Sequence, residues 1–266
     1  MKMHGKIALV TGGGRGIGKG CALELARQGA DICLNDRPGS SDLAATATEI
    51  RSLGRRCAAL EADAFARAGC EDLVARALDT FGRVDILISN PARSVNHAFI
   101  DFPPEDFEET LKGTLVAGFH ISQLVARHMV ERGDGGKIVF ISSVHAHRPF
   151  SGASAYNAAK SGLNHLARTI AAELISHRIN VNAIEPGWID TPGEREKFDS
   201  EAFGSEAGRL PWGRLGRPDD IGKAAAFLCS EGADYITGAV LRVDGGYVLR
   251  DSMAENMLND PTQKNP

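Results

Sequence analysis

The chain of 266 residues lacks the features that mark membrane-spanning and nucleic-acid-binding proteins. No apolar run approaches the roughly 20 residues that a membrane-spanning helix needs. The formal net charge of -4 provides no basic surface for a nucleic acid or an anionic membrane. We therefore expect no nucleic acid and no membrane as a partner, and we expect a small-molecule substrate instead.

Cysteine is scarce, and its positions suggest neither a disulfide framework nor a metal site. The five cysteines are Cys21, Cys33, Cys57, Cys70 and Cys229. Their number is odd and their spacing is not that of metal ligands, so reduced, buried thiols in a cytoplasmic protein are expected, with no metal. Residues Met1–Gly5 run directly into an expected strand, which leaves no room for a signal peptide.

Apolar runs alternate with helical patterns along the chain, within a composition that is 43% hydrophobic and 24% charged. Lys6–Thr11 is typical of a buried strand, and Gly16–Gly29 is typical of a helix that ends at a glycine. Further strands are expected over Ile32–Asp36, Cys57–Asp63, Val84–Asn90, Lys137–Ser143, Arg178–Ile184 and Ala239–Val243. Further helices are expected over Asp42–Leu53, Cys70–Phe81, Pro104–Arg132, Ser154–His177 and Asp219–Ser230.

This alternation predicts an α/β fold with a doubly wound, mostly parallel sheet and helices on both faces. The sequence contains no internal repeat and no linker-like change in composition, so residues 1–250 are predicted to form a single domain, followed by a polar tail over 251–266. In such a fold, ligands bind at the carboxyl ends of the strands.

A glycine-rich segment follows the first expected strand. Thr11–Gly18 reads TGGGRGIG, with Gly12, Gly16 and Gly18 in the spacing G-x-x-x-G-x-G rather than the strict G-x-G-x-x-G. Glycines allow the backbone to turn sharply and to approach a pyrophosphate at a helix N-terminus. A turn that binds nothing is the alternative, but the strand before it and the helix after it favour phosphate binding.

An acidic residue, Asp36, ends the second expected strand, eighteen residues after Gly18. A carboxylate there accepts hydrogen bonds from an adenosine ribose and repels a 2′-phosphate, whereas Arg15 and Arg37 would attract that phosphate. Because the carboxylate repels what the arginines attract, we expect NAD as the preferred cofactor and NADP as the alternative. Asp63, after the third strand, is either an adenine contact or a turn residue.

A tyrosine and a lysine are spaced four residues apart in the expected helix over Ser154–His177. In Tyr156–Lys160 (YNAAK), the i, i+4 spacing places both side chains on one helix face. A nearby ammonium lowers the tyrosine pKa from about 10, which suits proton exchange with an alcohol or a carbonyl. By itself the spacing is also that of an ordinary solvated pair. Ser143, at a strand end, is either a third member of this site or a cap.

Taken in order, these motifs closely resemble the short-chain dehydrogenase/reductase family, from Lys6 to Tyr247. The resemblance rests on Thr11–Gly18 (TGGGRGIG), Ser143, Tyr156–Lys160 (YNAAK), Pro186-Gly187 with Thr191, and Ile236–Gly246 (ITGAVLRVDGG). It implies a Rossmann-like seven-stranded sheet and an NAD(P)-dependent oxidoreductase that moves a hydride between nicotinamide and an alcohol/carbonyl pair. It also implies a homotetramer.

The resemblance assigns roles to individual residues. Tyr156 would be the general acid/base, Lys160 would bind the nicotinamide ribose and tune Tyr156, and Ser143 would orient the substrate oxygen. The cofactor contacts that it implies, with those expected above, are Gly12, Arg15, Gly16, Ile17, Gly18, Asp36, Asp63, Asn90, Tyr156, Lys160, Pro186, Gly187, Ile189 and Thr191.

The sequence departs from the family pattern at two places. Where the family usually has Asn-Asn-Ala-Gly, this chain has Ser89-Asn90-Pro91-Ala92, and Pro91 removes a backbone donor. Thr114 aligns with the catalytic asparagine, which helps to hold a water in a proton relay to the lysine. The Thr114 hydroxyl would support such a water with different geometry. A slower enzyme, a shifted relay and a catalytically impaired sensor or scaffold all fit this change.

The substrate is expected to be bound under residues 188–212, the predicted lid. This segment mixes charged and aromatic side chains, which favours a sugar or polyol, with a 3-oxoacyl thioester as the second choice. His145, Trp188 and Glu194 are candidate substrate contacts, although a loop histidine is more often a surface residue. A sugar-nucleotide epimerase or dehydratase would typically need a larger C-terminal domain than this chain has room for, so this function is not favoured.

Overall fold

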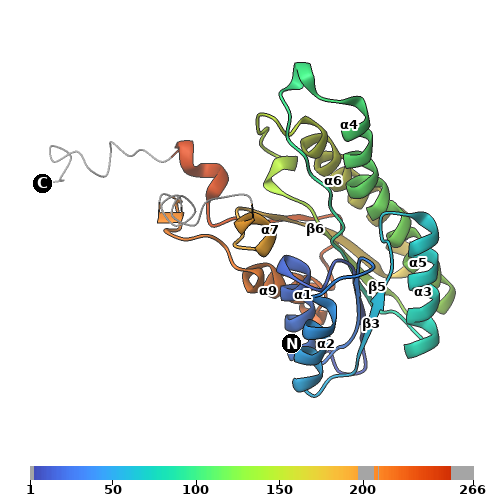
Figure 1. Ribbon diagram of the computed structural model, residues 1–266. Coiled ribbons are helices and arrows are strands. Elements are labelled where there is room, and N and C mark those ends of the chain that lie inside the picture. The colour runs from blue at the N-terminus through green and yellow to red at the C-terminus, as the bar shows by residue number, and fades with distance from the viewer. Residues whose placement is uncertain (1–2, 197–206, 209, 253–266) are drawn as a thin grey trace, which may run out of the picture.

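A parallel sheet of seven strands forms the centre of the computed structural model, which describes residues 3–196, 207–208 and 210–252 (Figure 1). Its order is β3-β2-β1-β4-β5-β6-β7, and every described strand pair is parallel. The strands are β1 (Ile7–Val10), β2 (Asp31–Asp36), β3 (Cys57–Glu61), β4 (Ile86–Ser89), β5 (Gly136–Ile141), β6 (Ile179–Pro186) and β7 (Val240–Val243). The predicted doubly wound fold is confirmed, and the sheet is parallel throughout rather than mostly so.

Strand β1 lies at the point where the order of the sheet reverses. It pairs with β2 on one side and β4 on the other, so that Val10 has Leu34 and Ile88 as its neighbours. All four residues of β1 are buried, as expected of a strand covered on both faces. The reversal separates the connections that leave β1 and β4, and it opens a crevice at their carboxyl ends.

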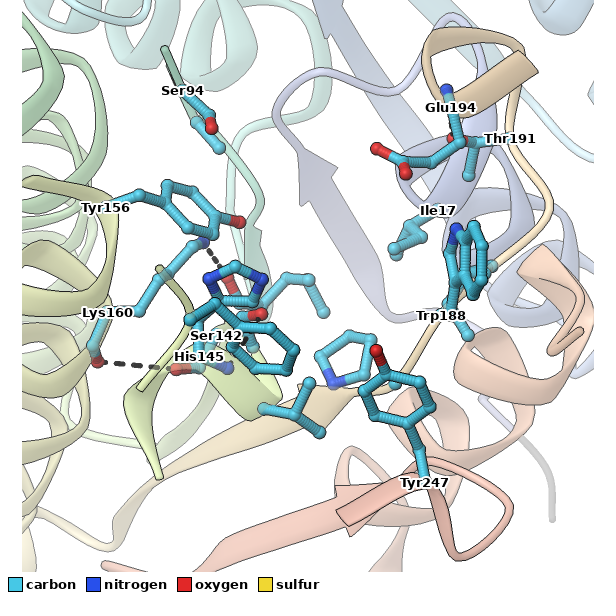
Figure 2. Close-up of a pocket in the computed structure, with 18 of the residues that line it drawn as sticks. Ile17, Ser94, Ser142, His145, Tyr156, Lys160, Trp188, Thr191, Glu194 and Tyr247 are labelled. Carbon is cyan, nitrogen blue, oxygen red and sulfur yellow. Dashed lines mark hydrogen bonds between the residues drawn. The ribbon is translucent and has the colours of Figure 1, made fainter. Parts of the chain in front are cut away.

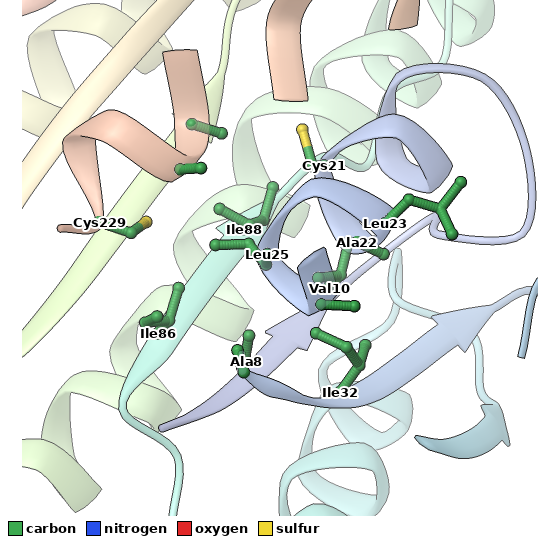
Figure 3. Packing of buried hydrophobic residues seen from close by; sticks show 14 of the residues in the cluster. Ala8, Val10, Cys21, Ala22, Leu23, Leu25, Ile32, Ile86, Ile88 and Cys229 are labelled. Atoms are coloured by element: carbon green, nitrogen blue, oxygen red, sulfur yellow. The ribbon is translucent and has the colours of Figure 1, made fainter. Parts of the chain in front are cut away.

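Helices cover both faces of the sheet (Figure 1). The helices on one face are α1 (Gly16–Arg27), α2 (Leu43–Ser52) and α9 (Pro218–Leu228). Those on the other are α3 (Arg67–Phe81), α5 (Ala117–Arg132) and α6 (Ser154–Leu174), with α4 (Pro104–Leu111) packed beside α6. Figure 3 shows Cys21, Ala22 and Leu25 of α1 above the apolar side chains of β1 and β4. The burial of these apolar side chains is the main favourable contribution to the stability of the fold.

Helices α1 and α9 touch through their backbones at two glycines. A Cβ atom on Gly20 would lie 2.5 Å from the carbonyl oxygen of Pro218, and one on Gly222 would lie 2.4 Å from that of Gly20. No other residue type fits such a close approach. Since α1 carries the end of the glycine-rich segment, this contact holds that segment against the sheet.

The predicted helix over Pro104–Arg132 is interrupted. Between α4 and α5 the residues Lys112–Val116 form a π-helical turn that includes Thr114. Short π-helical turns are often found at functional sites. The predicted helix over Ser154–His177 ends at Leu174 and continues as a 3-10 turn over Ile175–His177, before Arg178 adopts a left-handed conformation with a φ of 58°.

The predicted lid and tail are only partly described. Residues 188–196, 207–208 and 210–212 of the lid are described, and they include the short helix α7 (Pro192–Arg195). Residues 197–206 and 209 of the lid, and 253–266 of the predicted tail, lie outside the described residues. Among the helices of the described ranges, none combines the length and the apolar character that crossing a membrane requires.

The close approach of α1 and α9 predicts the effect of one added methyl group. Gly222→Ala should lower the free energy of unfolding by about 1–3 kcal/mol, because the new Cβ forces the helix backbones apart. Gly232→Ala is the matched control, since its Cβ would lie at an ordinary 3.4 Å from the Ser230 hydroxyl. Chemical denaturation measures both values. A Gly222→Ala protein as stable as the control would contradict the close packing of α1 against α9.

Candidate active site

A cavity of about 410 Å³ lies at the carboxyl ends of the central strands (Figure 2). It brings together residues that the sequence separates widely. The predicted site residues that line it are Ile17, Asn90, Ser143, His145, Tyr156, Lys160, Pro186, Gly187, Trp188, Ile189, Thr191 and Glu194. The expected catalytic, cofactor and substrate residues therefore meet in one cavity, although they come both from strand ends and from the helices α1, α6 and α7.

Lys160 is almost completely buried at one side of this cavity. Only 1% of the residue is exposed, and its Nζ donates a hydrogen bond of 2.7 Å to the carbonyl oxygen of Ile141. Nζ also lies 5.4 Å from the centre of the Tyr156 ring. Burial disfavours the ammonium form and lowers the pKa of Lys160 to about 7. At neutral pH this side chain is therefore poised between its two protonation states.

Tyr156 shares the cavity with Ser143. Burial raises the pKa of the Tyr156 phenol above its ordinary value, while a hydrogen bond with Ser143 opposes this shift and the charge of Glu194 adds to it. The lowered pKa expected from the nearby lysine is thus not seen, because burial outweighs the other effects and also weakens the charge of Lys160. A protonated phenol beside a serine hydroxyl is arranged to exchange a proton with a substrate oxygen.

Ser143 acts as a cap and also faces the cavity. It follows β5 and precedes a 3-10 turn over Val144–Ala146, and its hydroxyl oxygen accepts a hydrogen bond of 3.2 Å from the backbone N–H of His145. A hydroxyl also has a proton to donate. The two alternatives raised for this serine are therefore compatible: the cap orients the hydroxyl that lines the cavity.

The glycine-rich segment has the shape needed to bind a phosphate. Gly12 and Gly16 have φ angles of +59° and +57°, and a Cβ on Gly18 would lie 2.1 Å from the carbonyl oxygen of Gly12. The residue before α1, Arg15, makes no side-chain cap, and the first turn of α1 contains no acidic residue. The N-terminal N–H groups and the positive end of the α1 dipole thus suit an anion, and the segment fits a dinucleotide pyrophosphate.

Asp36 lies against this segment at the end of β2. Its two carboxylate oxygens accept hydrogen bonds of 2.8 Å from the backbone N–H of Arg37 and from the hydroxyl of Ser40. A Cβ on Gly14 would lie 2.1 Å from Asp36 Oδ2, so only glycine allows this contact. Arg15 bonds instead to Glu196, with Nη1 2.7 Å from the carboxylate. The Asp36 carboxylate is therefore in close contact with the backbone of the glycine-rich segment.

Two other predicted residues have local structural roles. Asp63 is exposed, does not line the cavity, and accepts a hydrogen bond of 2.9 Å from the backbone N–H of Phe65, as a turn residue does. Asn90 connects β4 to the glycine-rich segment: its side chain donates to the Gly12 carbonyl over 3.2 Å, and its backbone N–H donates to the Thr11 hydroxyl over 3.0 Å. Pro91 does not prevent these contacts.

Thr114 is fully buried and is not part of the cavity lining. Its hydroxyl donates to the backbone carbonyl of Arg93 over 3.0 Å and accepts from the backbone N–H of the same residue over 3.1 Å. The structure thus uses this hydroxyl to brace the loop after β4. Thr114 was expected to support a water molecule, but in the structure its hydroxyl is engaged with the backbone of Arg93.

The sequence reasoning missed an aromatic wall of the cavity. The ring of His145 stacks on Phe150 with centres 4.0 Å apart, and Phe150 faces Tyr247 with centres 6.1 Å apart. His145 Nδ1 lies 2.8 Å from the side-chain oxygen of Asn157. Phe150 and Tyr247 come from distant parts of the chain, and no local motif marks them. Figure 2 shows Trp188 and Glu194 on the side of the cavity opposite Tyr156.

Metal ligands do not gather here. Within the described ranges, no group of three or more His, Cys, Asp or Glu side chains is arranged to hold a metal ion.

Comparison with known proteins gives matches over nearly the whole chain. A family model described as enoyl-(acyl carrier protein) reductase matches residues 12–248. L-rhamnose 1-dehydrogenase (NAD(P)(+)) from Sphingomonas sp. strain SKA58 is 37% identical over 245 residues, which cover 92% of this chain and 96% of that protein. Such extensive matches extend the similarity well beyond the site residues.

Solved structures match equally extensively. The crystal structure of acetoin dehydrogenase from Salmonella typhimurium aligns with a TM-score of 0.84 and 39% identity, over 92% of this chain and 96% of that one. A short-chain type dehydrogenase/reductase from Mycobacterium marinum aligns with a TM-score of 0.87 and 30% identity, over 92% and 96% of the two chains.

The buried lysine predicts a pH-dependent stability. The pKa of Lys160 is about 7 in the folded protein, below its value in the unfolded chain, so the unfolded chain binds more protons above pH 7. The lysine therefore destabilises the fold most below pH 7, and this cost decreases as the pH rises. The stability advantage of Lys160→Met over wild type should shrink by up to about 1.4 kcal/mol per pH unit between pH 7 and 9.

Urea unfolding without cofactor, at several pH values, measures this difference. Lys223→Met, which replaces an exposed lysine on α9, is the control. An advantage of Lys160→Met that stays constant across the range would show that the lysine is not destabilised by burial.

Proposed function

Because the chain belongs to the short-chain dehydrogenase/reductase family and is an NAD(P)-dependent oxidoreductase acting on CH–OH groups, we propose that its substrate is a sugar or another polyol. The observation that carries the reaction type is the meeting of Ser143, Tyr156 and Lys160 in one cavity. Two similar proteins are named for rhamnose and acetoin, which are small hydroxylated molecules, and these names support the proposed class.

The residues of the cavity divide the chemistry between them. When bound, the nicotinamide cofactor supplies an acceptor for the hydride that leaves the carbinol carbon. Ser143 holds the substrate oxygen by a hydrogen bond, and the protonated Tyr156 phenol gives its proton to the carbonyl oxygen in the reductive direction. In the oxidative direction Tyr156 must first be a phenolate, which takes the proton of the substrate hydroxyl as the C–H bond breaks. The alcohol thus loses one hydride and one proton and becomes a carbonyl, and NAD(P)⁺ becomes NAD(P)H.

The chain's own residues would hold this cofactor along the strand ends. The Gly12–Gly18 segment would bind the pyrophosphate, Asp36 the adenosine ribose and Lys160 the nicotinamide ribose, with Thr191 near the carboxamide. We propose NAD as the preferred cofactor. Support comes from the hydrogen-bonded Asp36 carboxylate beside Gly14, and from Arg15, which is engaged with Glu196 instead of with that carboxylate. The 2′-phosphate of NADP would be repelled by the negative charge of Asp36.

Two other functions each have one observation in their favour. A 3-oxoacyl thioester reductase is supported by the description of the matching family model, which names an acyl carrier protein reductase. A sensor or scaffold that binds the cofactor without catalysis is motivated by Thr114, whose hydroxyl braces Arg93. Ser143, Tyr156 and Lys160 together favour catalysis over both a sensor and a scaffold.

We also propose a cytoplasmic homotetramer. All five cysteines are free and buried, which suits a reducing compartment. Helix α5 and the π-helical turn before it expose the apolar side chains of Phe119 and Val116, which are 39% and 38% accessible. Exposed apolar side chains on one helical stretch are suited to contact a second copy of the chain.

Tyr156→Phe tests the proposed function directly. Absorbance at 340 nm is followed while sugars, polyols and 3-oxoacyl thioesters are supplied with NAD(H) or NADP(H). The variant should lower kcat by about 10²- to 10⁴-fold, because the phenol that exchanges the proton is gone, while cofactor binding persists. Tyr235→Phe, at a fully exposed tyrosine, is the control and should retain activity. Full turnover in Tyr156→Phe would remove the proposed mechanism.

Asp36→Ala tests the cofactor preference. Removing the carboxylate should raise the ratio of kcat/KM for NADP over NAD by roughly tenfold, since one close charge repulsion is lost. Adding Arg37→Ala should cancel part of this gain if that arginine attracts the 2′-phosphate. Asp72→Ala, on the surface of α3, is the control. An unchanged ratio in Asp36→Ala would show that Arg15 or Arg37 decides the preference.

A further inference from the structure

A second cavity, of about 610 Å³, lies on the outer side of the glycine-rich segment. Its described lining comes from α1, α2, α7 and α9 and from the residues just before these helices, and Figure 1 shows α7 near α1 and α9. This lining includes four basic and four acidic side chains. One of the basic side chains is Arg15, which belongs to the glycine-rich segment itself. The ion pairs of this cavity therefore decide what the Arg15 guanidinium can bind.

Arg15 lies between two carboxylates from distant parts of the chain. Its Nη1 lies 2.7 Å from the carboxylate of Glu196, whereas its Nε lies 4.0 Å from that of Asp42. The shorter contact makes Glu196 the main partner, although 181 positions separate the two residues in the sequence. A guanidinium binds carboxylate and phosphate oxygens with the same N–H groups. While it is paired with Glu196, Arg15 is less available to a phosphate.

The fold places Glu196 within reach of Arg15. The segment before α7 is joined to Gly216 by two backbone hydrogen bonds of 2.8 and 2.9 Å. A Cβ on Gly16 would lie 3.4 Å from Cγ2 of Thr191, so the start of α7 lies against the glycine-rich segment. The backbone N–H of Glu196 then donates to the carbonyl of Pro192 over 3.0 Å, at the end of the same short helix. The described start of the lid is thus anchored beside the proposed pyrophosphate site.

The two forms of the cofactor make different demands on Arg15. Gly14, the residue before Arg15, is in close contact with Asp36, which would bind the adenosine ribose. A 2′-phosphate on that ribose would attract the guanidinium, which would have to leave Glu196 in order to bind it. NAD carries a hydroxyl at this position and requires no cation. Breaking the ion pair is therefore a cost for NADP alone.

We propose that Glu196 is a cofactor-specificity residue: it holds Arg15 away from the adenosine ribose, so that the start of the lid favours NAD over NADP. This inference rests on the proposed function and adds a second determinant to Asp36. The Asp36 carboxylate repels a 2′-phosphate, whereas Glu196 occupies the cation that would attract one. Because the Arg15 and Glu196 side chains are 42% and 63% exposed, solvent screens their attraction and the effect is moderate.

The experiment measures the binding of the reduced cofactors directly, so it requires no substrate. Fluorescence titrations give Kd for NADH and for NADPH with wild type, Glu196→Gln, Arg15→Gln and the double variant. Glu49→Gln is the matched control. Its carboxylate lines the same cavity but pairs with Lys19, at 2.6 Å, instead of with Arg15.

Glu196→Gln should lower the ratio of Kd for NADPH to Kd for NADH by roughly threefold, which is the size of effect expected of a half-exposed ion pair. The change should come from tighter binding of NADPH. In the Arg15→Gln background the same substitution should leave the ratio unchanged, since the cation is absent. Glu49→Gln should keep the wild-type ratio. The Kd for NADH shows in each variant that the cofactor site is intact.

Three results would overturn the inference. Glu196→Gln could keep the wild-type ratio, it could change the ratio equally in the Arg15→Gln background, or Glu49→Gln could change the ratio as much as Glu196→Gln does. The last two would show a general effect of negative charge rather than the release of Arg15. Failure of wild type to bind either cofactor is a different outcome, which refutes the proposed function itself.

Discussion

The hydrogen bond from Lys160 Nζ to the carbonyl oxygen of Ile141 is the interaction on which the site depends. It ties helix α6 to the end of strand β5, in a place from which water is almost completely excluded. Tyr156 lies one helical turn before Lys160, and Ser143 lies two residues after Ile141. Fixing the helix on the strand end therefore fixes the phenol beside the serine hydroxyl. Burial also brings the pKa of the lysine close to neutrality, so a small change in its surroundings alters its charge.

The cofactor side of the site depends on a different constraint, which is the close approach of backbones. Gly18 allows α1 to begin against Gly12, and Gly20 allows the same helix to lie against α9. Asn90 then connects β4 to the glycine-rich segment by a hydrogen bond. The two sides meet at the reversal of strand order between β1 and β4, where the fold leaves a crevice. Catalytic and cofactor groups are thus brought together by one sheet.

The substrate side of the cavity combines apolar and charged side chains. Among the described lining residues, an aromatic wall and the Glu194 carboxylate come from the segment after β5, from the segment after β7 and from α7. Thr114 lies in a π-helical turn, and its hydroxyl is hydrogen-bonded to the backbone of Arg93. The proton path beyond Lys160 therefore has to be organised without that hydroxyl.

Local sequence patterns were enough to predict the secondary-structure elements of this chain. Buried strands are short apolar runs, and the alternation with helices requires parallel crossovers, so the order of elements and the position of the glycine-rich segment were predictable. The i, i+4 spacing likewise placed Tyr156 and Lys160 on one face. Other properties of the site depend on contacts between groups that are distant in the sequence, and these became visible only in the folded chain. The direction of the Tyr156 pKa shift results from burial, and neither the bracing role of Thr114 nor the stacking of Phe150 on Tyr247 has a local signature. Desolvation and packing are properties of the assembled core, and no spacing of residues along the chain encodes them.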